Sequence, residues 1–84
     1  MPENESGDMR KLVEEIAKAL VDSPDAVSVK ADESDQGAAI ELHVAAADMG
    51  RVIGKQGRTA RSMRNILGVA GMKLQKRFTL DIVD

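Results

Sequence analysis

Gly54 and Gly57 stand three positions apart around Lys55-Gln56, between two segments whose apolar residues have helical spacing. Glycine adopts positive φ and lets other groups approach its backbone closely. A helix that begins directly after this loop would aim its free amide groups and positive dipole end at the same space. Such a loop favours an anion, above all a phosphate, held by main-chain amides and by Lys55. The loop alone is equally compatible with an ordinary corner between two helices.

Arginines follow the loop at a spacing that places them on one side of a helix. Arg58, Arg61 and Arg64 are three apart and share a face, whereas an apolar face is formed by Ala60, Met63, Leu67 and Ala70, with Ile66 at its edge. Arg51, Lys55, Lys73, Lys76 and Arg77 flank this helix, and no acidic residue occurs between Met49 and Leu80. Solvated charged faces normally mix signs, so this composition favours a phosphate-backbone site.

The charge distribution supports an anionic partner on one half of the chain. The 84 residues have a net charge of −2. Residues 1–48 have four basic and twelve acidic side chains, which gives a net charge of −8. Residues 49–84 have eight basic and two acidic side chains, which gives a net charge of +6. A basic half in an acidic protein indicates a local anionic partner, although the two halves can also attract each other.

Several kinds of chemistry are excluded by composition. The chain has no cysteine, one histidine (His43) and one aromatic residue (Phe78). Disulfides, thiolate metal sites and cysteine nucleophiles are therefore absent, and bases cannot be stacked on a sheet of aromatic rings. His43 is expected on the outward face of a strand without a catalytic partner. We expect no enzyme activity, no metal and no cofactor.

The sequence has no other nucleotide-binding motif and no segment typical of membrane insertion or targeting. Gly50 and Gly54 are too close for a Walker phosphate loop, and the dinucleotide fingerprint is missing. No apolar run is long enough to span a bilayer, so membrane insertion is not expected. Residues 1–8 are acidic and polar, unlike a signal or transit peptide, which favours a cytoplasmic protein.

Six elements are expected to position the loop. A helix should run from Met9 to about Leu20, capped by Ser6 or Asp8 and stopped by Asp22-Ser23-Pro24. Alternation predicts strands over 27–30, 40–44 and 78–82, with a polar turn over 32–37. A short helix over 49–53, capped by Asp48, and a long helix from 58 to about 72 flank the loop. Residues 1–8 are predicted to be a disordered extension of a single domain, 9–84.

The sequence VIGKQGR, residues 52–58, resembles the signature of the KH RNA-binding domain, whose GxxG loop holds the backbone of about four nucleotides. The order of elements resembles the type II KH arrangement. Segments 16–22, 40–42 and 80–84 extend the resemblance to the small single-domain bacterial KhpA family over residues 9–84.

The resemblance implies an α+β fold of order α-β-β-α-α-β, with a three-stranded mixed sheet backed by helices on one face and the last strand parallel to the second. It implies single-stranded RNA in a groove between the loop, the two central helices and the last strand. Lys55, Arg58 and the loop amides would hold phosphates, and Val52 and Ile53 would pack against bases. The implied RNA-binding residues are Val52, Ile53, Gly54, Lys55, Gln56, Gly57, Arg58, Arg61 and Arg64.

The family also implies a function and partners. The implied function is that of an RNA chaperone or post-transcriptional regulator, with a role in cell elongation, cell shape, cell wall biogenesis and envelope homeostasis. The implied partner is a KhpB-like KH protein. The alternative is a protein-interaction module that dimerises and contacts RNA incidentally. A homodimer is expected because the core of so small a domain is marginal.

The chain departs from the family pattern at three places. Thr59 and Ala60 stand where larger aliphatic residues are common, so the groove should have a different shape. Gly68 and Gly71 stand where helix formers are common. These two glycines either let a partner approach the helix or soften its end before the last strand. The acidic extension before Met9 is the third departure and should not touch RNA.

Overall fold

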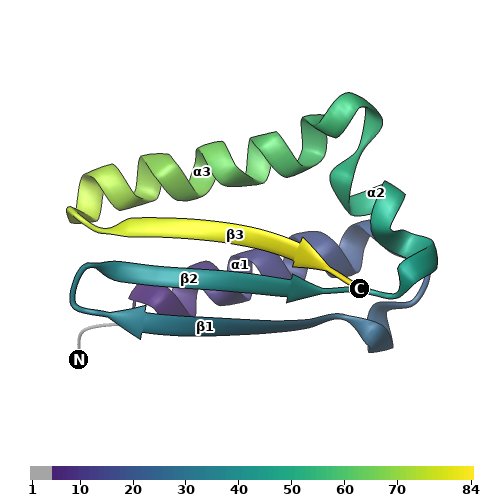
Figure 1. Ribbon diagram of the computed structural model, residues 1–84, viewed down its shortest axis with the longest axis horizontal. Helices are drawn as coiled ribbons and strands as arrows, with labels where there is room; N and C mark the ends of the chain where they lie inside the picture. The colour runs from purple at the N-terminus through teal and green to yellow at the C-terminus, as the bar shows by residue number, and fades with distance from the viewer. Residues whose placement is uncertain (1–4) are drawn as a thin grey trace.

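Three strands form one sheet, and the helices pack against a single face of it (Figure 1). The computed structural model describes residues 5–84. The elements in chain order are α1 (Glu5–Leu20), β1 (Ser28–Ser34), β2 (Gly37–His43), α2 (Met49–Ile53), α3 (Arg58–Leu74) and β3 (Arg77–Val83). Short 3-10 turns occupy Pro24–Ala26, Ala46–Asp48 and Lys55–Gly57. The predicted order α-β-β-α-α-β is confirmed.

The sheet has the order β1-β2-β3 and is mixed. β1 runs antiparallel to β2, with Ser28 opposite His43. β3 runs parallel to β2, with Gly37 opposite Arg77 and His43 opposite Val83. The chain between these two parallel strands contains α2, residues 54–57, which we call the GKQG loop, and α3. The crossover therefore carries the loop to the end of the sheet where β2 and β3 finish (Figure 1).

Alternation along the strands produces one buried and one uncovered sheet face. Ile40, Leu42 and Leu80 point into the core, where they meet residues of all three helices: Val13, Ala17, Val52, Met63 and Leu67. Ala39, Thr79 and Asp81 on the opposite face are exposed. Each large apolar side chain buried in this way stabilises the fold by about 1.5–3 kcal/mol relative to exposure.

The first helix begins earlier than predicted. α1 starts at Glu5, so the expected disordered extension over residues 1–8 is wrong for residues 5–8. Ser6 and Asp8 lie inside the helix, and neither is its N-cap. Acidic residues near a helix N-terminus are favoured by the helix dipole, which helps to extend the helix through Asp8. Residues 1–4 lie outside the described residues.

Three further boundaries lie beyond the predicted ones: the end of β1, the start of β2 and the end of α3. β1 and β2 reach Ser34 and Gly37, which shortens the predicted turn over 32–37 to two residues. α3 continues past Met72 to Leu74 and ends where Gln75 adopts a left-handed conformation, with φ of 56°. No helix within residues 5–84 is long and apolar enough to cross a membrane.

Candidate nucleic-acid interface

The GKQG loop owes its shape to positive φ angles at three of its four residues. φ is 79° at Gly54, 56° at Gln56 and 73° at Gly57. Gly54 N donates a hydrogen bond to Gly50 O at 2.9 Å, which closes α2, and Gly57 N donates to Gly54 O at 3.0 Å. A Cβ on Gly54 would also lie only 2.9 Å from the amide N of Thr59. Both the conformation and the close approach therefore require glycine at position 54.

The tip of the loop faces solvent and is followed directly by a helix. Lys55, Gln56 and Arg58 are exposed. Arg58 Nη2 donates a long hydrogen bond of 3.4 Å to Gln56 Oε1. Among residues 5–84, no side chain caps the N-terminus of α3. The helix N-terminus, with its partial positive charge, is thus flanked by two exposed cationic residues, Lys55 and Arg58.

Beside the loop lies an open hollow of about 320 Å³ that is lined by Ile53, Gly57, Ala60, Arg61, Arg64 and Ile82. These residues come from α2, α3 and β3 and from the loop itself. Buried Ala60 presents only a methyl group to the hollow. Aliphatic side chains of Ile53 and Ile82 and the cationic side chains of Arg61 and Arg64 complete its lining. The arrangement suits a flat apolar group bordered by anionic or hydrogen-bond-accepting groups.

The structure brings most of the predicted site residues together but removes Val52 from them. The side chain of Val52 has 0% exposure and belongs to the hydrophobic core. The predicted contact of Val52 with bases is therefore wrong, because neighbouring residues on a helix point in different directions. Ile53 is half-buried and lines the hollow, so it keeps the predicted position.

Arg64 crosses from α3 to the edge of the sheet. Its Nε donates a hydrogen bond of 3.2 Å to the main-chain O of Leu80. β3 pairs on one side with β2 and, among the described residues, with no strand on its other side. Leu80 O is therefore an acceptor on the open edge of β3. The sequence predicted Arg64 at the site but not this bond, since it depends on the packing of α3 against β3.

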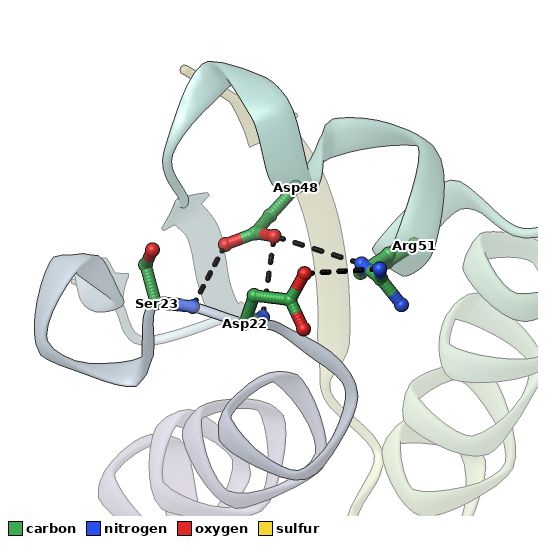
Figure 2. A network of polar contacts seen from close by, with 4 residues as sticks. All are labelled: Asp22, Ser23, Asp48 and Arg51. Carbon is green, nitrogen blue, oxygen red and sulfur yellow. Dashed lines mark hydrogen bonds and ion pairs between the residues drawn. The ribbon is translucent and has the colours of Figure 1, made fainter.

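Arg51, which flanks the loop in sequence, is engaged elsewhere. Arg51 Nη2 lies 2.9 Å from Asp22 Oδ2, and its Nε lies 3.8 Å from Asp48 Oδ1 (Figure 2). Asp48, with 2% exposure, accepts hydrogen bonds from the amides of Asp22 at 3.2 Å and Ser23 at 3.1 Å. Asp48 occupies the predicted N-cap position of α2, but its side chain forms no capping hydrogen bond with that helix. Its carboxylate instead ties the start of α2 to the chain following α1.

Three further basic residues, Lys73, Lys76 and Arg77, lie at the other end of α3. The 17 residues of this helix correspond to about 25 Å. Lys76 Nζ donates a hydrogen bond of 2.7 Å to the main-chain O of Asp35, in the turn between β1 and β2. These residues therefore do not extend the cationic surface around the loop. That surface consists of Lys55, Arg58, Arg61 and Arg64.

Sequence reasoning missed Ile82 as a residue of the hollow. Its signal was present in the alternation of β3, but only the parallel register, in which Leu42 lies opposite Ile82, places it near the loop. His43 lies on the uncovered sheet face as predicted and contacts Glu41. Within residues 5–84 there is no group of three or more side chains suited to hold a metal ion.

The two glycines of α3 have different surroundings. Gly71 is buried, and a Cβ there would lie 2.5 Å from Lys76 O. Gly71 therefore serves packing within the chain and is unavailable to a partner, contrary to one of the two expectations. A Cβ on Gly68 would meet open space, with no contact within 4 Å among residues 5–84. Near it, Ile66, Val69 and Met72 are 47%, 56% and 80% exposed. We call Ile66, Gly68, Val69 and Met72 the apolar surface of α3.

Comparison with known proteins identifies relatives along almost the whole chain. The family model for the KhpA/KhpB KH domain matches residues 10–82. The chain is 51% identical over 75 residues to the RNA-binding protein KhpA of Caldanaerobacter subterraneus subsp. tengcongensis, covering 89% of this chain and 100% of that protein. It is 50% identical over 76 residues to RNA-binding protein KhpA of Halalkalibacterium halodurans, covering 90% and 100%.

A solved structure shares the fold at low sequence identity. A variant of Aquifex aeolicus Era bound to GDP and aluminium fluoride matches with a TM-score of 0.64 and 18% identity. The match covers 98% of this chain and 31% of that one. This likeness concerns the fold described above, whereas the family is shown by the family model and by the two KhpA relatives. The chain belongs to the KhpA/KhpB family of KH-domain proteins.

Proposed function

We propose that this protein binds single-stranded RNA in the groove formed by the GKQG loop, α2, α3 and β3. The observation that carries the proposal is that an exposed loop and the N-terminus of α3 lie beside the hollow with its arginines. The relatives named RNA-binding protein KhpA support RNA as the ligand. Such a loop contacts about four nucleotides in KH domains generally.

Each part of the groove has a distinct role in this proposal. Lys55, Arg58 and the main-chain amides at the start of α3 hold phosphates, and Gly54 and Gly57 provide the backbone shape. The aliphatic side chains of Ile53 and Ile82 pack against bases. Because the hollow contains no aromatic ring, bases are held by aliphatic contact and hydrogen bonding. The expected activity is binding, and none of these roles requires a catalytic group.

The experiment that tests the proposal replaces the loop tip. Lys55→Asp combined with Gln56→Asp places two negative charges where phosphate is proposed to bind, and should abolish binding of a single-stranded RNA heptamer. Both residues are exposed, so the variant should keep its helical circular dichroism spectrum. A matched control, Lys73→Asp with Gln75→Asp, makes the same charge change at the far end of α3. Equal binding by wild type and loop variant would refute the proposal.

The biological role we propose follows the family. The protein acts in the cytoplasm as an RNA chaperone or post-transcriptional regulator, pairs with a KhpB-like KH protein, and contributes to cell elongation, cell shape, cell wall biogenesis and envelope homeostasis. The family model that matches the chain covers both KhpA and KhpB. A site for about four nucleotides binds weakly by itself, and a second linked site raises the overall affinity through effective concentration.

A second candidate function is protein interaction, with RNA contact incidental. The apolar surface of α3 favours it, because exposed apolar residues that cluster on one element are typical of interaction sites. Co-purification of a KhpB-like protein by the loop variant, without RNA binding by wild type, would favour this candidate.

A further inference from the structure

Arg64 differs from the other cations of the groove because its guanidinium is fixed by the protein main chain. Nε donates to Leu80 O at 3.2 Å, whereas the loop residue Arg58 has only a 3.4 Å contact with the exposed side chain of Gln56. A guanidinium has five N–H donors in a rigid plane. With Nε engaged, the two Nη groups remain as a fork with a defined direction. We infer that Arg64 recognises a base, and that phosphate binding belongs to the loop residues.

The position of Arg64 supports a base contact. Arg64 lies six residues after Arg58, which is about 9 Å along the helix and away from the loop tip. It lines the hollow together with buried Ala60 and with the aliphatic side chains of Ile53 and Ile82. Apolar surfaces of this kind accept a flat base, whereas a phosphate favours the exposed, amide-rich loop. The inference rests on the proposed RNA-binding function and assigns a specificity role within it.

The two Nη groups of Arg64 can form paired hydrogen bonds with only some of the bases. Two parallel N–H donors require two neighbouring acceptors on the base edge. Guanine offers O6 and N7, the pair that arginine binds most often in nucleic acids. Cytosine offers N3 and O2 on its Watson–Crick edge. Adenine and uracil place an N–H donor beside each acceptor on the corresponding edges, so one arm of the fork would meet another donor. Arg64 should therefore favour guanine or cytosine over adenine and uracil.

The experiment compares heptamers that differ at one base. Oligouridine of seven nucleotides is used with its central uridine unchanged or replaced by guanosine, cytidine or adenosine, and affinities are measured by fluorescence anisotropy. A bidentate contact is worth about fivefold to hundredfold in affinity. Wild type should bind the guanosine or the cytidine heptamer at least about fivefold more tightly than the other two. Comparison of the guanosine heptamer with the cytidine heptamer identifies which of the two bases supplies the acceptors.

Arg64→Lys is the decisive variant because it keeps the charge and loses the fork. It should bind all four heptamers within about twofold of each other, with an unchanged dependence of affinity on salt. Arg61→Lys is the matched control in the same hollow, where no fixing hydrogen bond is found among the described residues, and should keep the discrimination. Arg58→Ala should weaken binding of all four heptamers alike and reduce the salt slope by about 0.7, as expected for one phosphate contact on a single strand.

Three results would overturn the assignment. They are equal affinity of wild type for the four heptamers, retained discrimination in Arg64→Lys, and a uniform loss in Arg64→Ala accompanied by a lower salt slope. The last would make Arg64 a phosphate contact while the proposed function stands. Failure of wild type to bind any heptamer would instead refute the RNA-binding function and the inference with it. Circular dichroism of each variant establishes that folding is retained.

Discussion

Gly71 and Lys76 approach each other so closely that a methyl group on Gly71 would lie 2.5 Å from the carbonyl oxygen of Lys76. Lys76 N also donates a hydrogen bond of 2.8 Å to Gly71 O. This contact joins the last turn of α3 to the start of β3. The obstacle is main chain, which cannot rotate away as a flexible side chain could.

Alanine substitution should therefore have opposite effects at two glycines of one helix. Gly71→Ala should destabilise the protein by about 1–3 kcal/mol through overpacking. Gly68→Ala should stabilise it by about 0.5–1 kcal/mol, because the added methyl meets open space and alanine is the better helix former. Urea unfolding followed by circular dichroism gives both values. Equal stability of the two variants would contradict the assigned surroundings.

The buried carboxylate of Asp48 should matter more than the exposed cation beside it. Asp48→Ala leaves the amides of Asp22 and Ser23 without their acceptor, and we expect a loss of about 2 kcal/mol. The side chain of Arg51 is 54% exposed, so Arg51→Ala should lower stability by less than about 1 kcal/mol. Because Arg51 is paired away from the hollow, that variant should also keep its RNA affinity. Thermal unfolding and anisotropy measure the two effects.

RNA affinity should decrease with salt in proportion to the phosphates held. Three or four phosphate contacts on a single strand predict a slope of log affinity against log salt of roughly −2 to −3. Titration of a uridine heptamer between low and moderate salt gives the slope. A slope near zero would show that the backbone is not the principal contact, and would favour the protein-interaction function.

The purified protein is predicted to dimerise through the apolar surface of α3. Gly68→Arg introduces a long charged side chain in the middle of that surface and should shift the protein to a monomer. Light scattering over a concentration series measures the mass, and Glu15→Arg on α1 is a control for added positive charge. A constant mass near 9.0 kDa for wild type at every concentration would rule out the prediction.

The order of elements and the loop were predictable because they depend on local patterns. Alternation at Ile40 and Leu42, helical spacing from Arg58 onward, and two glycines around Lys55-Gln56 each report on a few neighbouring residues. These signals were sufficient for the α-β-β-α-α-β order and for the position of the loop between two helices. The parallel pairing of the last strand was an expectation from the fold resemblance.

The errors concern properties that depend on distant parts of the chain. Val52 and Ile53 are adjacent and both aliphatic, yet only the packing of α2 on the core decides that Val52 is buried. Arg51 is removed from the cationic surface by Asp22, which lies 29 positions earlier. Neither of these relationships has a local signature.

The hollow is lined by residues that are close together in the sequence and by residues of β3 that are far from them in the sequence. The loop, Ile53 and the arginines come from one continuous segment, α2 to α3, whereas Ile82 and Leu80 O belong to β3 and reach their positions only when β3 pairs with β2. A state in which β3 has left the sheet would retain the loop and lose the Ile82 wall. A ligand that requires the complete hollow binds only the fully paired sheet, so its binding free energy adds to the stability of that pairing. Occupancy of the groove should thus protect the amide hydrogens of β2 that bond to β3 from exchange with solvent.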